Sequence, residues 1–226
     1  MKKSLAVIAA LTVLAIPVVC TAATVRPGGY MSGFVGINVN QDASVASTDF
    51  VTNRDFNDQV EFDPNINIGG TAGYNFGIVR LEGELSYKHA EIGSVTSQSN
   101  GFRFRNVNGG IGALAMMFNG FLDLHNDSRL TPYLGGGIGF ASLHLSDTTG
   151  FNSNGERIVL YGAADDTVFA YQAGTGVEIA LDRRYSLDIG YRYFATGRGN
   201  FDSDLPITTS LKFRSHNAAL GFRYRF

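Results

Sequence analysis

Eight segments of the chain alternate apolar residues with small or polar residues at a period of two. This period is typical of β-strands whose two faces meet different surroundings. In Ile78–Lys88, for example, Leu81, Leu85 and Tyr87 alternate with charged side chains. The eight segments are Tyr30–Val39, Asn65–Tyr74, Ile78–Lys88, Phe104–Leu122, Thr131–Leu143, Thr167–Leu181, Tyr185–Phe194 and Leu211–Phe226. Segments about ten residues long with one apolar face are typical of transmembrane β-barrel strands.

The connections between these segments alternate in length. The short ones are Asn75–Gly77, Asp123–Arg129 and Asp182–Arg184. The long, polar ones are Asn40–Asp63, His89–Arg103, Leu145–Asp166 and Ala195–Ser210. Bacterial outer-membrane barrels have short periplasmic turns and long external loops. The pattern therefore predicts an all-β fold, an eight-stranded antiparallel up-and-down barrel with both termini in the periplasm. Only the glycine-rich first half of Phe104–Leu122 leaves its register open.

The N-terminus has the features of a secretory signal peptide. Lys2 and Lys3 precede an apolar run, Leu5–Val19, and small residues follow it up to Ala23. We expect cleavage after Ala22 or Ala23, so that residues 1–23 are the signal peptide and residues 24–226 the barrel domain. The alternative is a single membrane anchor. The apolar run is short for a spanning helix and no stop-transfer signal follows it.

Composition excludes several classes of function. Cys20 is the only cysteine and precedes the expected cleavage site, so the mature chain has no disulfide, thiol nucleophile or cysteine-ligated metal. Lipidation at Cys20 is disfavoured because Val19, which is not small, precedes it. Loss of Lys2 and Lys3 changes the formal charge from −2 to −4. No basic block remains, so we expect no nucleic-acid partner.

Charged residues of both signs occupy the inward positions of the predicted strands. They are Arg80, Glu82, Glu84, Lys88, Glu178, Asp188, Arg192, Arg223 and Arg225. An eight-stranded barrel has an interior just wide enough to be filled by side chains. Charges in such an interior are tolerated when they pair and form hydrogen bonds. The pattern therefore predicts a structural network of ion pairs that plugs the barrel. The alternative is an ion or proton path, as in a small channel.

Three other patterns suggest catalysis or ligand binding less well. Glu82 and Glu84 as a general acid and base would need substrate access, which a filled lumen denies. The run Gly135–Gly139 lacks the spacing and the following helix of a nucleotide-binding loop, and inward glycines instead leave room for other side chains. The histidines are scattered, at His89, His125, His144 and His216, without metal-ligand spacing. We expect no cofactor and no metal.

His144 and Ser146 form the one catalytic pattern retained as an alternative. Residues two apart share a face of a strand, so this pair would serve as base and nucleophile on an acyl ester. The arrangement resembles the His-x-Ser pair of outer-membrane lipid A deacylases. No acidic residue at a suitable spacing completes it, and a polar pair at a strand end is the commoner meaning.

Several segments resemble a known family. Thr131–Gly139, Phe169–Gly174 and Leu187–Tyr193 resemble the fifth, sixth and seventh strands of the opacity-protein and OmpA-like barrels. Phe222, Tyr224 and Phe226 resemble the C-terminal signal by which such barrels are assembled. The resemblance implies the outer membrane of a Gram-negative envelope. It also implies three partners: outer-membrane lipid with lipopolysaccharide, the barrel assembly machinery, and an extracellular ligand or host surface.

The resemblance covers the membrane domain alone. We expect no peptidoglycan-binding domain after Phe226, so the tethering role of full-length OmpA is not expected either. The leading hypothesis is a non-enzymatic surface barrel whose loops serve adhesion, recognition or envelope integrity, because rigid scaffolds carry function on their loops. The alternatives are an acyl hydrolase with His144 and Ser146, and a small channel.

Overall fold

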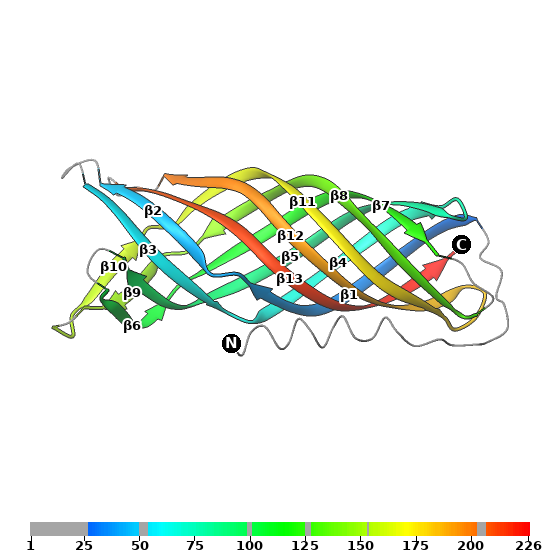
Figure 1. The fold of residues 1–226 in the computed structure, drawn as a ribbon, viewed down its shortest axis with the longest axis horizontal. Helices are drawn as coiled ribbons and strands as arrows, with labels where there is room; N and C mark the ends of the chain where they lie inside the picture. Colours follow the sequence, from blue (N-terminus) through cyan, green and yellow to red (C-terminus); the bar gives the residue numbers. More distant parts are fainter. Residues whose placement is uncertain (1–26, 50–53, 99–100, 125–127, 153, 203–206) are drawn as a thin grey trace.

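The protein is an elongated β-barrel (Figure 1). The computed structural model describes residues 27–49, 54–98, 101–124, 128–152, 154–202 and 207–226; the predicted signal peptide, residues 1–23, lies outside them. The strands are β1 Gly28–Asn40, β2 Ala43–Asp49, β3 Arg54–Asp63, β4 Asn65–Asn75, β5 Val79–Ser97, β6 Arg103–Asn108, β7 Gly110–Asp123, β8 Leu130–Leu145, β9 Thr148–Phe151, β10 Arg157–Tyr161, β11 Ala164–Ala180, β12 Tyr185–Asp202 and β13 Ile207–Arg225. None of the described residues belongs to a helix long and apolar enough to cross a membrane.

Eight antiparallel strands close into a ring in the order β1, β4, β5, β7, β8, β11, β12, β13. The ring closes where β13 pairs with β1, from Tyr30 opposite Arg225 to Asn40 opposite Ser215. The predicted eight-stranded antiparallel barrel is confirmed. Gly28 lies opposite Asn75, and Arg225 lies opposite Tyr30. The first and last strands of the barrel therefore begin and end, respectively, at the end of the barrel that carries the short turns.

The short turns are built by local hydrogen bonds. Between β4 and β5, Gly77 has a φ of 109°, a conformation that side chains disfavour. Its N–H donates to Asn75 Oδ1 at 2.7 Å. Between β11 and β12, Asp182 Oδ1 accepts from the N–H groups of Arg184 and Tyr185 at 2.7 and 2.8 Å. These bonds lower the pKa of Asp182.

The long connections contain strands, which the sequence pattern did not predict. β2 pairs with β13 and β3, and β3 pairs with β5, so both extend the barrel wall beyond β1 and β4. β6, β9 and β10 form a smaller antiparallel sheet that joins the end of β5. The fourth predicted segment is therefore two strands, because β6 ends before Gly109 and only β7 enters the ring.

The inside and outside of the wall exchange character along each long strand. On β5, Leu85 and Tyr87 are exposed outward while Glu84 and Lys88 are buried inside. Two residues farther along, Glu91 is exposed and Ala90 and Ile92 are buried. The part of the wall that lies beyond Lys88, away from the short turns, is therefore apolar on its inner face and polar on its outer face, as in a water-soluble β-protein. Its core includes Val45, Val60, Ile111, Leu143, Leu145, Phe194, Phe201, Leu211 and Phe213.

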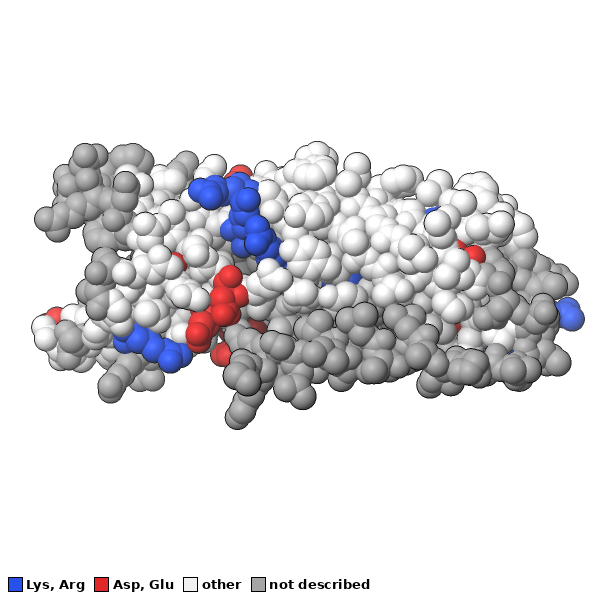
Figure 2. Space-filling model, in the orientation of Figure 1, with Lys and Arg blue, Asp and Glu red and all other residues white. Residues whose placement is uncertain are grey.

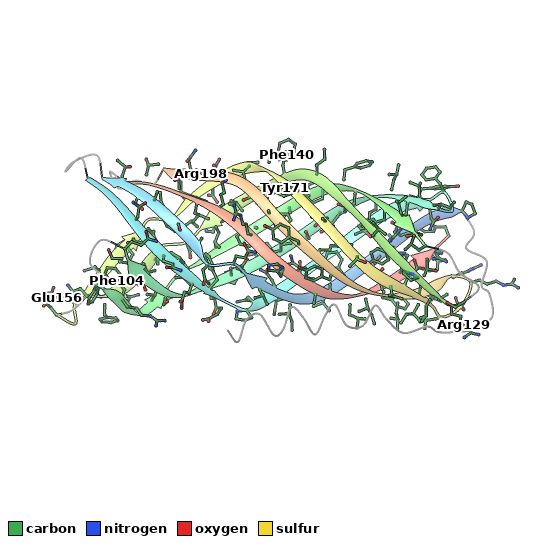
Figure 3. All side chains as sticks on the ribbon, in the orientation of Figure 1. Phe104, Arg129, Phe140, Glu156, Tyr171 and Arg198 are labelled. Atoms are coloured by element: carbon green, nitrogen blue, oxygen red, sulfur yellow. The ribbon has the colours of Figure 1, made fainter. Side chains whose placement is uncertain are left out.

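Large apolar side chains cover the outside of the remaining wall. Aromatic residues concentrate at both edges of this band, as in outer-membrane barrels. The edge near the short turns has Tyr74, Phe76, Tyr185, Phe222 and Phe226, and the other edge has Tyr87, Phe140, Phe169 and Tyr171. Figure 3 shows Phe140 and Tyr171 on the outer surface, Arg129 at the short-turn end and Glu156 at the opposite end.

Candidate functional site

The candidate site is the charged interior between the two aromatic edges. Its first group joins Arg80, Glu82, Glu84, Asp123 and Arg192. Arg80 Nη1 lies 3.6 Å from Glu82 Oε2, and Arg80 Nε lies 3.2 Å from Asp123 Oδ1. Arg192 pairs with Glu84 and lies 3.4 Å from Glu82 Oε1. Four strands contribute to this cluster: β5, β7 and β12 through charged side chains, and β8 through the ring of Tyr133.

The second group joins Glu178, Asp188, Arg223 and Arg225. Arg223 pairs with Glu178 and has its Nη2 3.3 Å from Asp188 Oδ2. Arg225 also pairs with Glu178. These residues come from β11, β12 and β13, which are consecutive in the ring. Each carboxylate in the group has a cationic partner, as burial of charge requires.

Hydrogen bonds from neutral side chains satisfy the same carboxylates. Tyr30 Oη donates to Glu82 Oε2 at 2.6 Å, and Tyr133 Oη donates to Asp188 Oδ1 at 2.8 Å. Asn119 Nδ2 and Gln172 Nε2 donate to Glu84 Oε2 at 3.0 and 2.8 Å. Donors therefore reach the buried oxygens from strands on several sides of the lumen.

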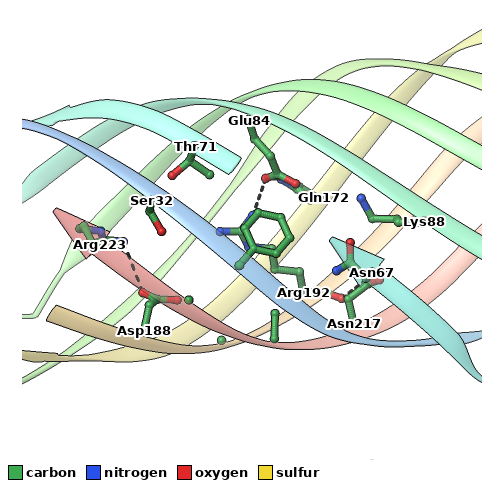
Figure 4. A pocket seen from close by; sticks show the side chains of 14 residues that line it. Ser32, Asn67, Thr71, Glu84, Lys88, Gln172, Asp188, Arg192, Asn217 and Arg223 are labelled. Carbon is green, nitrogen blue, oxygen red and sulfur yellow. Dashed lines mark hydrogen bonds and ion pairs between the residues drawn. The ribbon is translucent and has the colours of Figure 1, made fainter. Parts of the chain in front are cut away.

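Aromatic rings fill the space beside the arginines. The Arg80 guanidinium carbon lies 4.8 Å from the Phe121 ring centre and 4.7 Å from that of Tyr133. Gly176 makes room for Tyr133, because a Cβ there would lie 2.4 Å from Tyr133 Oη. The cavity that Figure 4 shows beside Arg192 and Glu84 has a volume of about 20 Å³. A cavity of this size holds about one water molecule.

The structure places the nine predicted inward charges in the lumen, and eight of them form ion pairs. Lys88 is the exception among the described residues: its Nζ donates to Ser86 Oγ at 2.7 Å and lies 4.3 Å from the Phe194 ring centre. Lys88 therefore lies in the lumen without an ion pair to a described carboxylate. Lys88 is the last inward charge of β5, where the apolar core begins.

Two contributors were missed by sequence reasoning. The sequence pattern assigns Asp123 to a turn, but β7 continues to it and its carboxylate faces Arg80. The same pattern gives Tyr30 only the start of a strand, although it is 2% exposed and its Oη donates to Glu82. The alternation itself was the available signal, because Asp123 has the same parity as the inward Asn119 and Phe121.

The His144–Ser146 pair lies outside the lumen, at the outer end of β8. His144 Nδ1 lies 2.6 Å from Asp165 Oδ1, so an acidic neighbour exists, contrary to the sequence-based expectation. The β8–β11 register supplies it, since Asp165 lies opposite His144. Ser146 Oγ is engaged elsewhere: it donates to Gly110 O at 2.9 Å and accepts from Gly110 N–H at 2.8 Å.

The remaining histidines do not cluster. His89 and His216 lie on β5 and β13, and His125 falls outside the described residues. Within the part of the chain that the structure describes, no group of three or more histidine, cysteine, aspartate or glutamate side chains is arranged to hold a metal ion.

The closed eight-stranded ring, the apolar band on its outside and the charged interior place the protein in the class of transmembrane β-barrel proteins. The chain belongs to the outer membrane protein beta-barrel domain family, whose model matches residues 6–226. The OmpA-like resemblance is consistent with this membership. The protein is accordingly an outer-membrane protein.

Three known proteins illustrate the relationship. The chain is 30% identical to outer membrane protein PagN of Salmonella typhimurium over 131 residues, which are 54% of this chain and about half, 53%, of PagN. It is 25% identical to the 31 kDa outer-membrane immunogenic protein of Brucella melitensis over 238 aligned positions, 96% of this chain and 92% of that protein. The crystal structure of OprG from Pseudomonas aeruginosa shares the fold, with a TM-score of 0.56, 15% identity and coverage of 88% of this chain and 96% of OprG.

Proposed function

We propose that the protein is a non-enzymatic surface barrel that does not conduct ions. We call the part of the barrel that contains β2, β3, β6, β9 and β10 the outer extension, and we propose that it serves adhesion, recognition or envelope integrity. Both termini then lie in the periplasm, and β2, β3, β6, β9 and β10 lie outside the cell. The supporting observation is the lumen, where ion pairs pack around a cavity of about 20 Å³ beside Arg192 and Glu84. A filled lumen leaves the external surface as the part that meets other molecules.

The outer extension has the rigidity that a recognition surface needs. β2, β3 and β10 share the apolar core with β5, β7, β8, β11, β12 and β13, and β6 packs against that core. Tyr161 on β10 donates from Oη to Asp58 Oδ2 on β3 at 2.9 Å, which joins the first and third long connections. Loops held by a packed core present their side chains in fixed positions, which reduces the entropic cost of binding.

Planar-bilayer recording of the purified protein tests the plugged lumen. We expect no stable single-channel conductance from the wild type. The variant Arg192→Ala, which removes side-chain volume from the lumen, serves as the comparison. Stable, large conductance by the wild type would favour the channel alternative.

Orientation and surface function need separate experiments. Asn154 lies exposed in the β9–β10 connection, and Asn154→Cys introduces a thiol that we expect a membrane-impermeant maleimide to label on intact cells. Labelling only after lysis would reverse the proposed orientation. Binding of intact cells to host-cell and matrix surfaces, with and without the protein, then tests adhesion directly.

The acyl-hydrolase alternative has one new observation in its favour, the contact between His144 and Asp165. The bonds between Ser146 Oγ and Gly110 argue against it, because a nucleophile needs its base within hydrogen-bond reach. Measuring acyl release from lipid A by the wild type and by Ser146→Ala distinguishes the acyl-hydrolase alternative from the non-enzymatic proposal. We expect no release above background from either protein.

A further inference from the structure

The outward side chains of β12 and β13 change from apolar to basic at the outer aromatic edge. On β13 the outward series runs from Phe222 and Leu220 to His216 and then to Arg214 and Lys212. On β12 it ends in Tyr191 and Tyr193, and Arg198 follows a bulge. Aromatic residues at the edge of the apolar band lie at the level of lipid headgroups. The basic side chains therefore begin at that level.

The three cations form one cluster. Arg198 lies directly opposite Lys212 in the β12–β13 register, and Arg214 lies two residues from Lys212 on the same face. All three are exposed, and Figure 2 shows blue side chains gathered on the outer part of these strands. They border a surface groove of about 460 Å³ between β13 and β2, whose wall also includes Ser210 and Asp42.

The cluster is positioned to receive an anion. Within the described part of the chain, the ion pairs involve cations other than Arg198, Lys212 and Arg214. Like charges this close repel one another, and an anion bound between them relieves the repulsion. Among the described residues of the groove wall, Asp42 is the one acidic side chain.

The rings of Tyr191, Tyr193 and His216 form a group, called the ring platform, that adjoins the cluster on the side of the apolar band. The His216 ring centre is 6.1 Å from that of Tyr191 and 5.3 Å from that of Tyr193. Tyr191 Oη lies 2.6 Å from His216 Nδ1, and Gln41 Nε2 lies 2.9 Å from His216 Nε2. The polar atoms of the platform are thus held at the same edge as the cations. Elsewhere around the wall, the exposed side chains above the edge include Glu91 on β5 and Asp165 on β11.

We propose that Arg198, Lys212 and Arg214 bind the phosphate groups of a lipid headgroup in the outer leaflet. The site lies on the outside of the barrel, with the acyl chains of the lipid against the apolar side chains below His216. Arginine and lysine are the side chains that bind phosphate. The inference rests on the proposed orientation, because the cluster faces the outer leaflet only if the long connections are external.

Binding of lipid A to the folded barrel in phosphatidylcholine nanodiscs tests this site. The variant Arg198→Gln/Lys212→Gln/Arg214→Gln removes the cluster. Each cation near an anionic lipid surface contributes enough to change binding about fivefold, so we expect roughly 100-fold weaker binding. The matched control is Arg129→Gln/Arg183→Gln/Arg184→Gln, which removes three exposed cations at the short-turn end and should bind as the wild type does.

Two further ligands identify the chemistry. Lipid A from which both phosphates have been removed should bind the wild type as weakly as phosphorylated lipid A binds the variant. Equal binding with and without phosphates, or equal loss in the control variant, would overturn the proposal. So would tighter binding of dextran sulfate or inorganic phosphate than of lipid A. The labelling of Asn154→Cys reports orientation independently, so failure of the lipid site and failure of the proposed orientation are distinguishable.

Discussion

Arg192 shows how a single charged side chain holds the interior together. Its guanidinium pairs with Glu84 and Glu82 on β5 and lies 5.4 Å from the Phe34 ring centre and 5.6 Å from that of Phe121. Gly174 faces it on β11, where a Cβ would lie 2.9 Å from Arg192 Cγ. One side chain therefore spans the lumen from β12 to β5.

We expect Arg192→Ala to lower the free energy of unfolding by about 3–5 kcal/mol, because it leaves Glu82 and Glu84 buried with fewer cationic partners. Urea unfolding in detergent micelles, followed by far-ultraviolet circular dichroism, measures the change. Arg129→Ala in an exposed turn is the control and should have little effect. Equal stability of both variants would contradict a dry ion-pair network.

Asp58 couples the stability of the outer extension to pH. Burial raises the pKa of its carboxyl, while hydrogen bonds from Tyr161 and Ser97 oppose the rise. The folded protein then holds a proton that the unfolded chain has released, so stability falls as pH rises from about 4 through the raised pKa. We expect Asp58→Asn to abolish this fall and Tyr161→Phe to extend it to higher pH. Limited proteolysis of the outer extension between pH 4 and 7 measures both, and identical profiles for all three proteins would refute the coupling.

At the scale of one element, β5 contains the full exchange of character along the wall. Leu85 is 53% exposed within the apolar band, whereas Glu91 is exposed beyond it. Leu85→Arg places a charge in the hydrocarbon and should cost about 2–4 kcal/mol, whereas Glu91→Arg should cost ~1 kcal/mol or less. Reversible folding into lipid bilayers measures the difference. Equal costs would mean that the membrane boundary lies elsewhere on β5.

The last strand, β13, tests the assembly signal. Phe226 is 76% exposed, and its ring meets Tyr224 edge-on at 5.4 Å. Because the end of the chain resembles the signal read by the assembly machinery, deletion of Phe226 should reduce the amount of folded protein in the outer membrane. Phe169→Ala, which removes an aromatic residue from the opposite edge, is the control. Fractionation at native expression level measures both, and an unchanged yield without Phe226 would argue against the signal.

At the scale of the whole molecule, closure of the ring removes both sheet edges. β13 pairs with β1 over eleven residue pairs, so within the described ring of eight strands no strand edge is open to denaturant. The folded protein should therefore migrate differently from boiled protein on a detergent gel. Identical migration of unboiled and boiled samples extracted from outer membranes would contradict a closed barrel.

Alternation at a period of two, together with the alternating lengths of the connections, was sufficient to predict the ring of eight strands. A strand that faces lipid on one side cannot shift its register by one residue without exposing its charged face to hydrocarbon, so the pattern specifies both the strands and their inward residues. For this reason Arg80, Glu82, Arg192 and Arg223 could be placed inside from the sequence alone.

The tertiary structure decided what those residues contact and where the membrane pattern ends. Register across strands brings Asp165 to His144 and Asp123 to Arg80, and leaves Lys88 beside Phe194; a single strand carries no information about these partners. The sequence pattern predicts loops for the outer extension, because the strands there are apolar on the opposite face. In the outer extension the outward face of each strand meets water, and the inward face packs its apolar side chains into the core. The hydrophobic effect therefore reverses the pattern of the membrane band, where the apolar side chains face outward.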